Sequence, residues 1–310
     1  MIQKVNNIGM SFGRAAVAAT FLFYIGGCTP EGEQEVAAEK IQDPTEEADA
    51  TTDNDGAINK SGKVFYTIPS PLELTSIIKK AGAKYDNSVL NSTKNISNYV
   101  TETSQALNLG VYGADLSYAS IFEQTQETIV YFAAAHKLAD ALGITAAFGE
   151  STIERVQNNL NNRDSLVAII SDSYWETDAY LKENKRSSIS GLVVAGGWLE
   201  GLYISTKLAQ KTENNEGIVS RIGEQKLTLS NLIAMLRSFE DPEVTEVVAD
   251  LKELKDVFAD VEITYTRQAP TTDPETKVMT LNTTSTINIS AEVLASITEK
   301  VDDIRTKIVN

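Results

Sequence analysis

Few side chains in this chain of 310 residues could do chemistry, because it has only one histidine and one cysteine. Zinc and haem sites need clustered ligands at fixed spacings, which these two residues do not supply. His136 has Ala133 three residues before it, so it also lacks the Glu-x-x-His motif of ferritin-like di-iron sites. A phosphate-binding loop and a dinucleotide fingerprint are absent too. The sequence therefore predicts no metal, no cofactor and no catalytic residue.

Carboxylate pairs are the remaining catalytic option, since two carboxylates acting together can hydrolyse a glycosidic bond. Glu123 and Glu127 are one helical turn apart, but a solvated helix face explains such a pair better. Asp115 is less ordinary, because it stands among apolar and aromatic residues between Gly110 and Tyr118. We expect a helix to start there, with Asp115 either satisfying nearby donors or contributing to a binding site.

A second unusual segment, 191–203, carries four glycines inside a helical pattern, each costing about 1 kcal/mol relative to alanine. One compensation is close helix packing, with Glu200 paired to a buried partner. The other is a ligand groove between this segment and the one around Asp115. The candidate groove residues are Tyr112, Asp115, Tyr118, Trp198 and Glu200.

Helical signals dominate the segments that must position these residues. Ser70, Pro71 and Glu73 combine an N-cap, a proline at the first helical position and a capping-box glutamate, and Gly82 ends this predicted helix. Further helical patterns are expected at 96–109, 112–142, 152–160, 164–181, 189–209, 244–261 and 294–308. Residues 129–135 are apolar on all sides, which predicts a helix in the middle of the bundle.

Only the region 261–289 favours strands, because Val261, Ile263 and Tyr265 alternate with polar residues and a threonine-rich run follows. The predicted fold class is therefore all-α, a multi-helix bundle with a small β-hairpin near 261–289. Short connections between the helices favour one helical domain over residues 63–310.

The formal net charge of −16 limits the classes of possible binding partner, since an acidic surface repels the phosphate backbones of nucleic acids and anionic lipid headgroups. We therefore expect no nucleic-acid partner. Hydrophobic residues make up 42% of the chain, enough to bury a core, which excludes disorder throughout.

The N-terminal segment has the pattern of a secretory signal: Lys4 and Arg14 precede the apolar run 15–25. That run is too short to cross a bilayer, which takes about 20 apolar helical residues. The residues that follow, Ile25-Gly26-Gly27-Cys28, resemble the lipobox of bacterial lipoproteins of the Gram-negative envelope type. The resemblance covers only about the first thirty residues. It implies a signal peptide over 1–27 and acyl chains on Cys28, which would be the membrane anchor.

Residues 28–62 are expected to form a disordered acidic tether after the lipidated cysteine, with ten acidic residues and one lysine between Glu31 and Gly56. Its first glutamates resemble the surface-export signal of some Gram-negative lipoproteins, while a solvated spacer explains them equally well. We therefore expect attachment to the outer membrane, with both the periplasmic face and the cell surface left open.

The leading functional hypothesis is a membrane-anchored, exported lipoprotein whose helical domain is a non-catalytic binding or scaffold module of the cell envelope. Its partner would be an envelope protein or a small molecule. The alternative is a hydrolase acting on envelope glycans through carboxylates such as Asp115 and Glu200, which requires that both line one open cleft.

Overall fold

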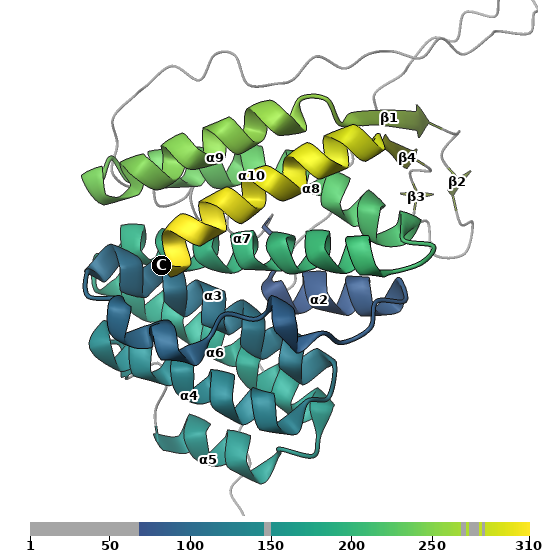
Figure 1. The fold of residues 1–310 in the computed structure, drawn as a ribbon. Coiled ribbons are helices and arrows are strands. Elements are labelled where there is room, and N and C mark those ends of the chain that lie inside the picture. Colours follow the sequence, from purple (N-terminus) through teal and green to yellow (C-terminus); the bar gives the residue numbers. More distant parts are fainter. Residues whose placement is uncertain (1–67, 146–149, 268–270, 273–278, 281–282) are drawn as a thin grey trace, which may run out of the picture. The chain divides into compact units, whose positions relative to one another are not determined.

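The computed structural model describes residues 68–145, 150–267, 271–272, 279–280 and 283–310. The predicted signal peptide, Cys28 and the acidic tether lie outside the described residues, so they stay predictions. The described part is an all-α multi-helix bundle with a small hairpin, which confirms the predicted fold class (Figure 1). Its α-helices are α2 (Pro71–Lys80), α3 (Glu102–Ile121), α4 (Thr125–Ala141), α5 (Glu150–Asn158), α6 (Arg163–Glu183), α7 (Ser187–Lys211), α8 (Glu216–Arg237), α9 (Thr245–Phe258) and α10 (Ala291–Val309). In the described ranges, the 3₁₀ helices η1 (Asn87–Val89), η2 (Thr93–Asn98) and η4 (Pro242–Val244) lie in the connections.

The ends of α2 are those that the sequence predicts. The Ser70 side chain accepts a hydrogen bond from the Glu73 backbone N–H at 3.2 Å, and Pro71 is the first helical residue. After the helix, Gly82 adopts a φ of +93°, a conformation that glycine reaches without a Cβ clash. The amide of Ala83 then donates back to the Ile78 carbonyl, which closes the helix end.

The helix boundaries around Gly110 differ from the prediction. A break was expected between 109 and 112, yet α3 runs through Gly110 and Gly113 without interruption, and Asp115 lies in the middle of the helix. The break comes later, at Glu123, which has a φ of +61° and ends α3 where a glycine is more usual. Glycine in a buried helix is tolerated where packing requires it, and packing outweighs helix propensity here.

Two further helices correct the sequence analysis. Helix α8 was not predicted at all, because polar residues such as Gln225 and Thr228 stand within its buried stripe. Helix α4 contains the segment 129–135 that was predicted to be surrounded by protein, and that prediction is wrong. Ile129 and Val130 are 39% and 48% exposed, so α4 has one face in the core and one in solvent.

The predicted hairpin is confirmed. Strand β1 (Glu262–Arg267) pairs antiparallel with β4 (Thr283–Asn288), with Ile263 opposite Ile287. The two-residue strands β2 (Thr271–Thr272) and β3 (Met279–Thr280) pair farther along. The hairpin contacts α8 at Gly223, where an added Cβ would lie 2.4 Å from the Ile287 side chain. A glycine in α8 therefore makes room for the base of the hairpin.

Helices α3 and α7 form the centre of the bundle, and most residues of both are buried. In Figure 1, α7 lies between α8, α9 and α10 on one side and α3, α4 and α6 on the other. The two central helices approach most closely at glycines. A Cβ on Gly110 would lie 2.1 Å from the Val193 carbonyl oxygen, and one on Gly196 would lie 2.0 Å from the Leu107 carbonyl oxygen. The glycines of segment 191–203 therefore allow close helix packing, which is one of the two compensations that the sequence analysis offered for them.

Within the described ranges, no helix combines the length and the apolar character needed to cross a membrane.

Replacing Gly196 by alanine is expected to destabilise the bundle by at least about 3 kcal/mol, the upper end for overpacking, because the clash is with backbone and not with a movable side chain. The matched control is Gly217→Ala in α8, where the added Cβ would be 3.2 Å from the Ala81 methyl carbon. This control should stay within about 1 kcal/mol of the wild type, since alanine also improves helix propensity. Urea unfolding followed by circular dichroism measures both changes, and equal stabilities of the two variants would contradict the tight crossing.

Candidate functional site

The five predicted groove residues are all in the core. Tyr112, Asp115 and Tyr118 lie on α3, Trp198 and Glu200 lie on α7, and each is at most 2% exposed. The structure brings Asp115 and Glu200 together, but the tyrosines turn to other partners. Tyr112 donates to the Ser92 carbonyl, and Tyr118 stacks on Tyr85. Trp198 belongs to a separate cavity, described below, so the five residues do not form one groove.

Glu200 is paired with Arg305 from α10, a partner that the sequence analysis did not identify. The guanidinium Nε lies 2.6 Å from Glu200 Oε2 and Nη2 lies 2.7 Å from Oε1, a two-pronged geometry. The Arg305 guanidinium also stacks over the Tyr203 ring at 3.9 Å. The one available signal was the place of Arg305 beside Val301 and Ile304 in the buried stripe of the last helix.

Asp115 adds a second carboxyl group to this single cation. Burial raises its pKa well above the ordinary 3.8, and the negative charge of Glu200 raises it further. Arg305 and the Asn91 backbone N–H, which donates to Asp115 Oδ2 at 3.1 Å, oppose that rise without cancelling it. The other oxygen, Oδ1, receives no hydrogen bond within the described part of the chain. A protonated Asp115 that donates to Glu200 explains both observations and leaves the cluster with one negative and one positive charge.

Asn91 connects this cluster to the rest of the core. Its side-chain amide donates to the Tyr99 hydroxyl at 3.1 Å, and its carbonyl accepts from the Tyr131 hydroxyl at 3.0 Å. Tyr99 in turn donates to the carbonyl of Val309 at the end of α10. The polar groups therefore bind one another and the backbone, which is the arrangement expected of a structural network.

Such burial bears on the hydrolase hypothesis. Asp115 and Glu200 are both 0% exposed, and a glycosidase needs two carboxyl groups that flank a substrate and a water. These two residues therefore do not supply the open cleft that the hypothesis requires.

A cavity open to solvent lies elsewhere, between α2, α6 and α7. It measures about 210 Å³ and its walls are mostly apolar. Among its lining residues are Leu72, Tyr174, Trp175, Val194 and Trp198. The chain contains two tryptophans, and both contribute to this lining. An apolar cavity of about 150 Å³ is known to stay dry and to bind benzene, so this one is large enough for a small organic molecule.

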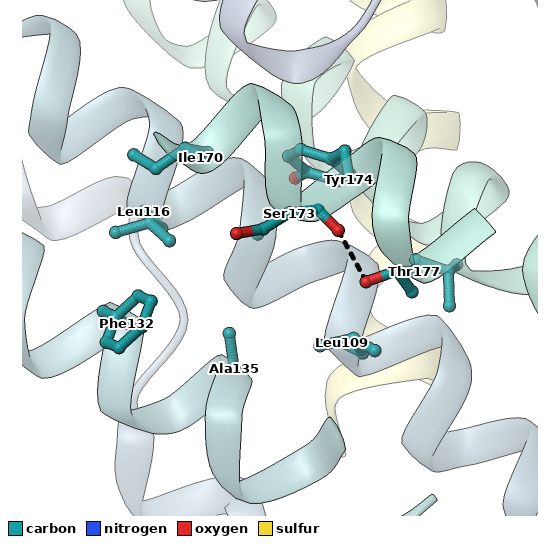
Figure 2. A pocket seen from close by; sticks show the side chains of 10 residues that line it. Leu109, Leu116, Phe132, Ala135, Ile170, Ser173, Tyr174 and Thr177 are labelled. Carbon is teal, nitrogen blue, oxygen red and sulfur yellow. Dashed lines mark hydrogen bonds between the residues drawn. The ribbon is translucent and has the colours of Figure 1, made fainter. Parts of the chain in front are cut away.

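A smaller cavity of about 30 Å³ lies on the other side of Tyr174, among α3, α4 and α6 (Figure 2). Tyr174 and Val193 line both cavities. The lining is apolar, with Leu116, Phe132 and Ala135 labelled in Figure 2. The Ser173 and Thr177 hydroxyls are used within α6, since Ser173 donates to the Ile169 carbonyl and Thr177 to the Ser173 carbonyl. The buried Tyr174 hydroxyl has no hydrogen-bond partner among the described residues. The space beside the larger cavity is therefore mostly apolar, with one unpaired hydroxyl.

The larger cavity is held by specific contacts of α7. The Trp198 indole N–H donates to the Gln225 side chain of α8 at 3.0 Å, which fixes the ring. At the neighbouring position, a Cβ on Gly197 would lie 3.2 Å from Pro71 Cγ, so glycine lets the start of α2 approach α7. Sequence reasoning selected Trp198 but missed Tyr174 and Trp175. The available signal was an adjacent tyrosine and tryptophan in a stretch, 171–178, that is otherwise polar.

Metal chemistry finds no support in the described residues, which contain no group of three or more histidine, cysteine, aspartate or glutamate side chains placed to hold an ion. His136 lies half-buried on α4.

Comparisons with known proteins add no family. A scan against protein-family models, a search of the curated proteins and a search of the solved structures each found no match to this chain.

The variant Asp115→Asn is expected to change how stability depends on pH. The folded protein keeps the Asp115 proton above the ordinary pKa of 3.8, where the unfolded chain has lost it. The folded state therefore binds more protons, and the free energy of unfolding falls as pH rises from about 4 toward the raised pKa, by up to about 1.4 kcal/mol per pH unit. Asparagine does not titrate and its amide can donate to Glu200, so the variant should lack this contribution.

Urea unfolding at several pH values between about 4.5 and 8 measures the slope for wild type and Asp115→Asn. Asp303→Asn is the matched control, because Asp303 is exposed on α10. The control should keep the wild-type slope. If Asp115→Asn keeps it too, the assignment of the proton is wrong.

Proposed function

We propose that this protein is an exported lipoprotein whose helical bundle is a non-catalytic binding module of the cell envelope. Acyl chains on Cys28 would attach it to the outer membrane, at the periplasmic face or the cell surface. The cavity between α2, α6 and α7 would take a small, largely apolar molecule. The observation that carries the binding part is that cavity, which is lined by both tryptophans of the chain.

Support for the anchor comes from the sequence. The only cysteine stands directly after the apolar run and two glycines, where lipoprotein processing needs it. Two or three acyl chains hold a protein at a membrane where one chain gives only reversible binding. The acidic segment that follows is long enough, on the order of 30 Å as a flexible coil, to let the bundle stand clear of the bilayer.

Support for binding comes from the contrast between two regions of the bundle, the buried charged cluster around Arg305 and the apolar cavity between α2, α6 and α7. The two carboxyl groups of the hydrolase hypothesis, Asp115 and Glu200, are both buried, and Glu200 is paired with Arg305. The cavity between α2, α6 and α7 is instead mostly apolar and aromatic, with Trp175 46% exposed and Trp198 held in place by Gln225. Pockets with apolar and aromatic walls bind small molecules by burial of apolar area.

Binding can be tested with N-phenyl-1-naphthylamine, a neutral apolar fluorescent probe, and a protein that comprises residues 28–310. We expect saturable enhancement of probe emission together with quenching of the tryptophans, since both lie at the cavity. Val194→Phe fills the cavity and should weaken binding at least about tenfold. Val130→Phe, at an exposed position of α4, is the matched control and should bind as the wild type does.

Circular dichroism and thermal unfolding establish that both variants fold. Folded Val194→Phe protein that binds the probe with unchanged affinity would place the probe outside the cavity. Absence of saturable binding to the wild type would refute the binding function.

Anchoring can be tested by expressing the complete chain in a Gram-negative host with radiolabelled palmitate. We expect label on the wild type, a mass that corresponds to cleavage before Cys28, and recovery in the membrane fraction. Cys28→Ala should carry no label and should leave that fraction. A wild-type chain that is unlabelled and retains residues 1–27 would exclude the anchor.

A further inference from the structure

The charge on the described residues that line the cavity is negative. Among the described residues that line it, Glu73 of α2 is the one charged group, and no lysine or arginine is among them. The remaining polar lining consists of Ser70, Ser171 and the aromatic polar atoms. Among the described residues, a ligand that enters this cavity therefore meets mostly apolar walls and one carboxylate.

The Glu73 carboxylate is available to a ligand. Its backbone N–H donates to Ser70 Oγ, but the second bond of a capping box, in which the Ser70 backbone N–H would donate to the Glu73 carboxylate, is not formed. In the described ranges the carboxylate makes neither a hydrogen bond nor an ion pair. It is exposed, so solvent and a bound molecule can both reach it.

The N-terminus of α2 acts in the opposite direction, because it carries the equivalent of about half a positive charge. The full negative charge of Glu73, in the first turn of the same helix, exceeds it. The potential at this end of the cavity is therefore negative. The chain as a whole carries a net charge of −16, and a net negative charge raises the concentration of cations near a protein.

The aromatic residues that line the cavity also favour a positively charged ligand. Tyr174, Trp175 and Trp198 line the cavity, and a cation is attracted to the negative face of an aromatic ring. Trp175 combines the highest exposure of the three with a place in the lining, so it lies where a charged group can remain partly hydrated.

We propose that the ligand is an apolar organic cation, with its hydrocarbon body in the cavity and its ammonium group beside Glu73 and Trp175. This inference rests on the proposed binding function. It deepens that function by assigning a charge and a chemical class to the ligand.

The test uses two probes of nearly the same size and shape, phenyltrimethylammonium and tert-butylbenzene, which differ in charge. Each competes with N-phenyl-1-naphthylamine for the full-length protein without its leader. The cation should displace the probe at a concentration about three- to tenfold lower than the neutral molecule, the range expected for one exposed carboxylate and a cation–π contact. Added salt should reduce this advantage.

Glu73→Gln should abolish most of the preference and leave tert-butylbenzene binding unchanged. Glu299→Gln removes an exposed acid of α10 that is not part of the cavity, so it controls for net charge and should keep the preference.

The outcomes separate the two proposals. If the naphthylamine probe and both competitors fail to bind, the binding function itself is refuted. If tert-butylbenzene binds as tightly as the cation, or if Glu73→Gln keeps the preference, the cavity remains a binding site and the cationic ligand is overturned.

Discussion

The contact between α3 and α7 is the constraint on which the rest of the bundle depends. At Gly110 and Gly196 the backbones touch, with no space for even one added carbon atom on either side. Glycine is less favourable than alanine within a helix by about 1 kcal/mol, so these positions are kept at a cost to local propensity. In return the two helices form a tight pair that carries Asp115, Glu200 and Trp198. Those side chains can be placed accurately only because the helices cannot slide apart.

The buried ion pair then fixes the C-terminal helix on this central pair. Removing an arginine and a glutamate from water costs several kcal/mol per ion, and their attraction repays that only with good geometry. The two hydrogen bonds from Arg305 to Glu200 and the stacking of the guanidinium on the Tyr203 ring supply such geometry. The net gain in stability can still be small. Its larger effect is on specificity, since loss of one partner would leave a buried charge, a cost of about 3–5 kcal/mol, in any other docking of α10.

The sequence predicted the helical class, the ends of α2 and the hairpin because these follow from local patterns: an N-cap serine, a C-terminal glycine and alternating residues. It misplaced the break near Gly110, because propensity at a glycine argues for a helix end while tertiary packing requires a continuous helix. It also overestimated the burial of α4, since apolar composition does not reveal that Ile129 and Val130 face solvent. The partner of Glu200 was not found, because Arg305 is 105 residues away. The place of Arg305 beside the apolar stripe of α10 indicates that it is largely buried, but does not reveal which acid it contacts.

The predicted groove failed for a geometric reason that also explains the site observed in its place. Trp198 and Glu200 are two residues apart, which corresponds to about 200° around a helix, so they must face nearly opposite directions. On α3, Leu109, Gly113 and Leu116 repeat at intervals of four and three and line the smaller cavity, whereas Asp115 points to Glu200. Each central helix therefore has one polar face, which belongs to the network around Arg305, and one face that borders apolar space. The apolar face of α3 lines the smaller cavity, and that of α7 lines the larger one. Because the same two helices bear both faces, the charged network that excludes solvent also keeps the cavity walls in place.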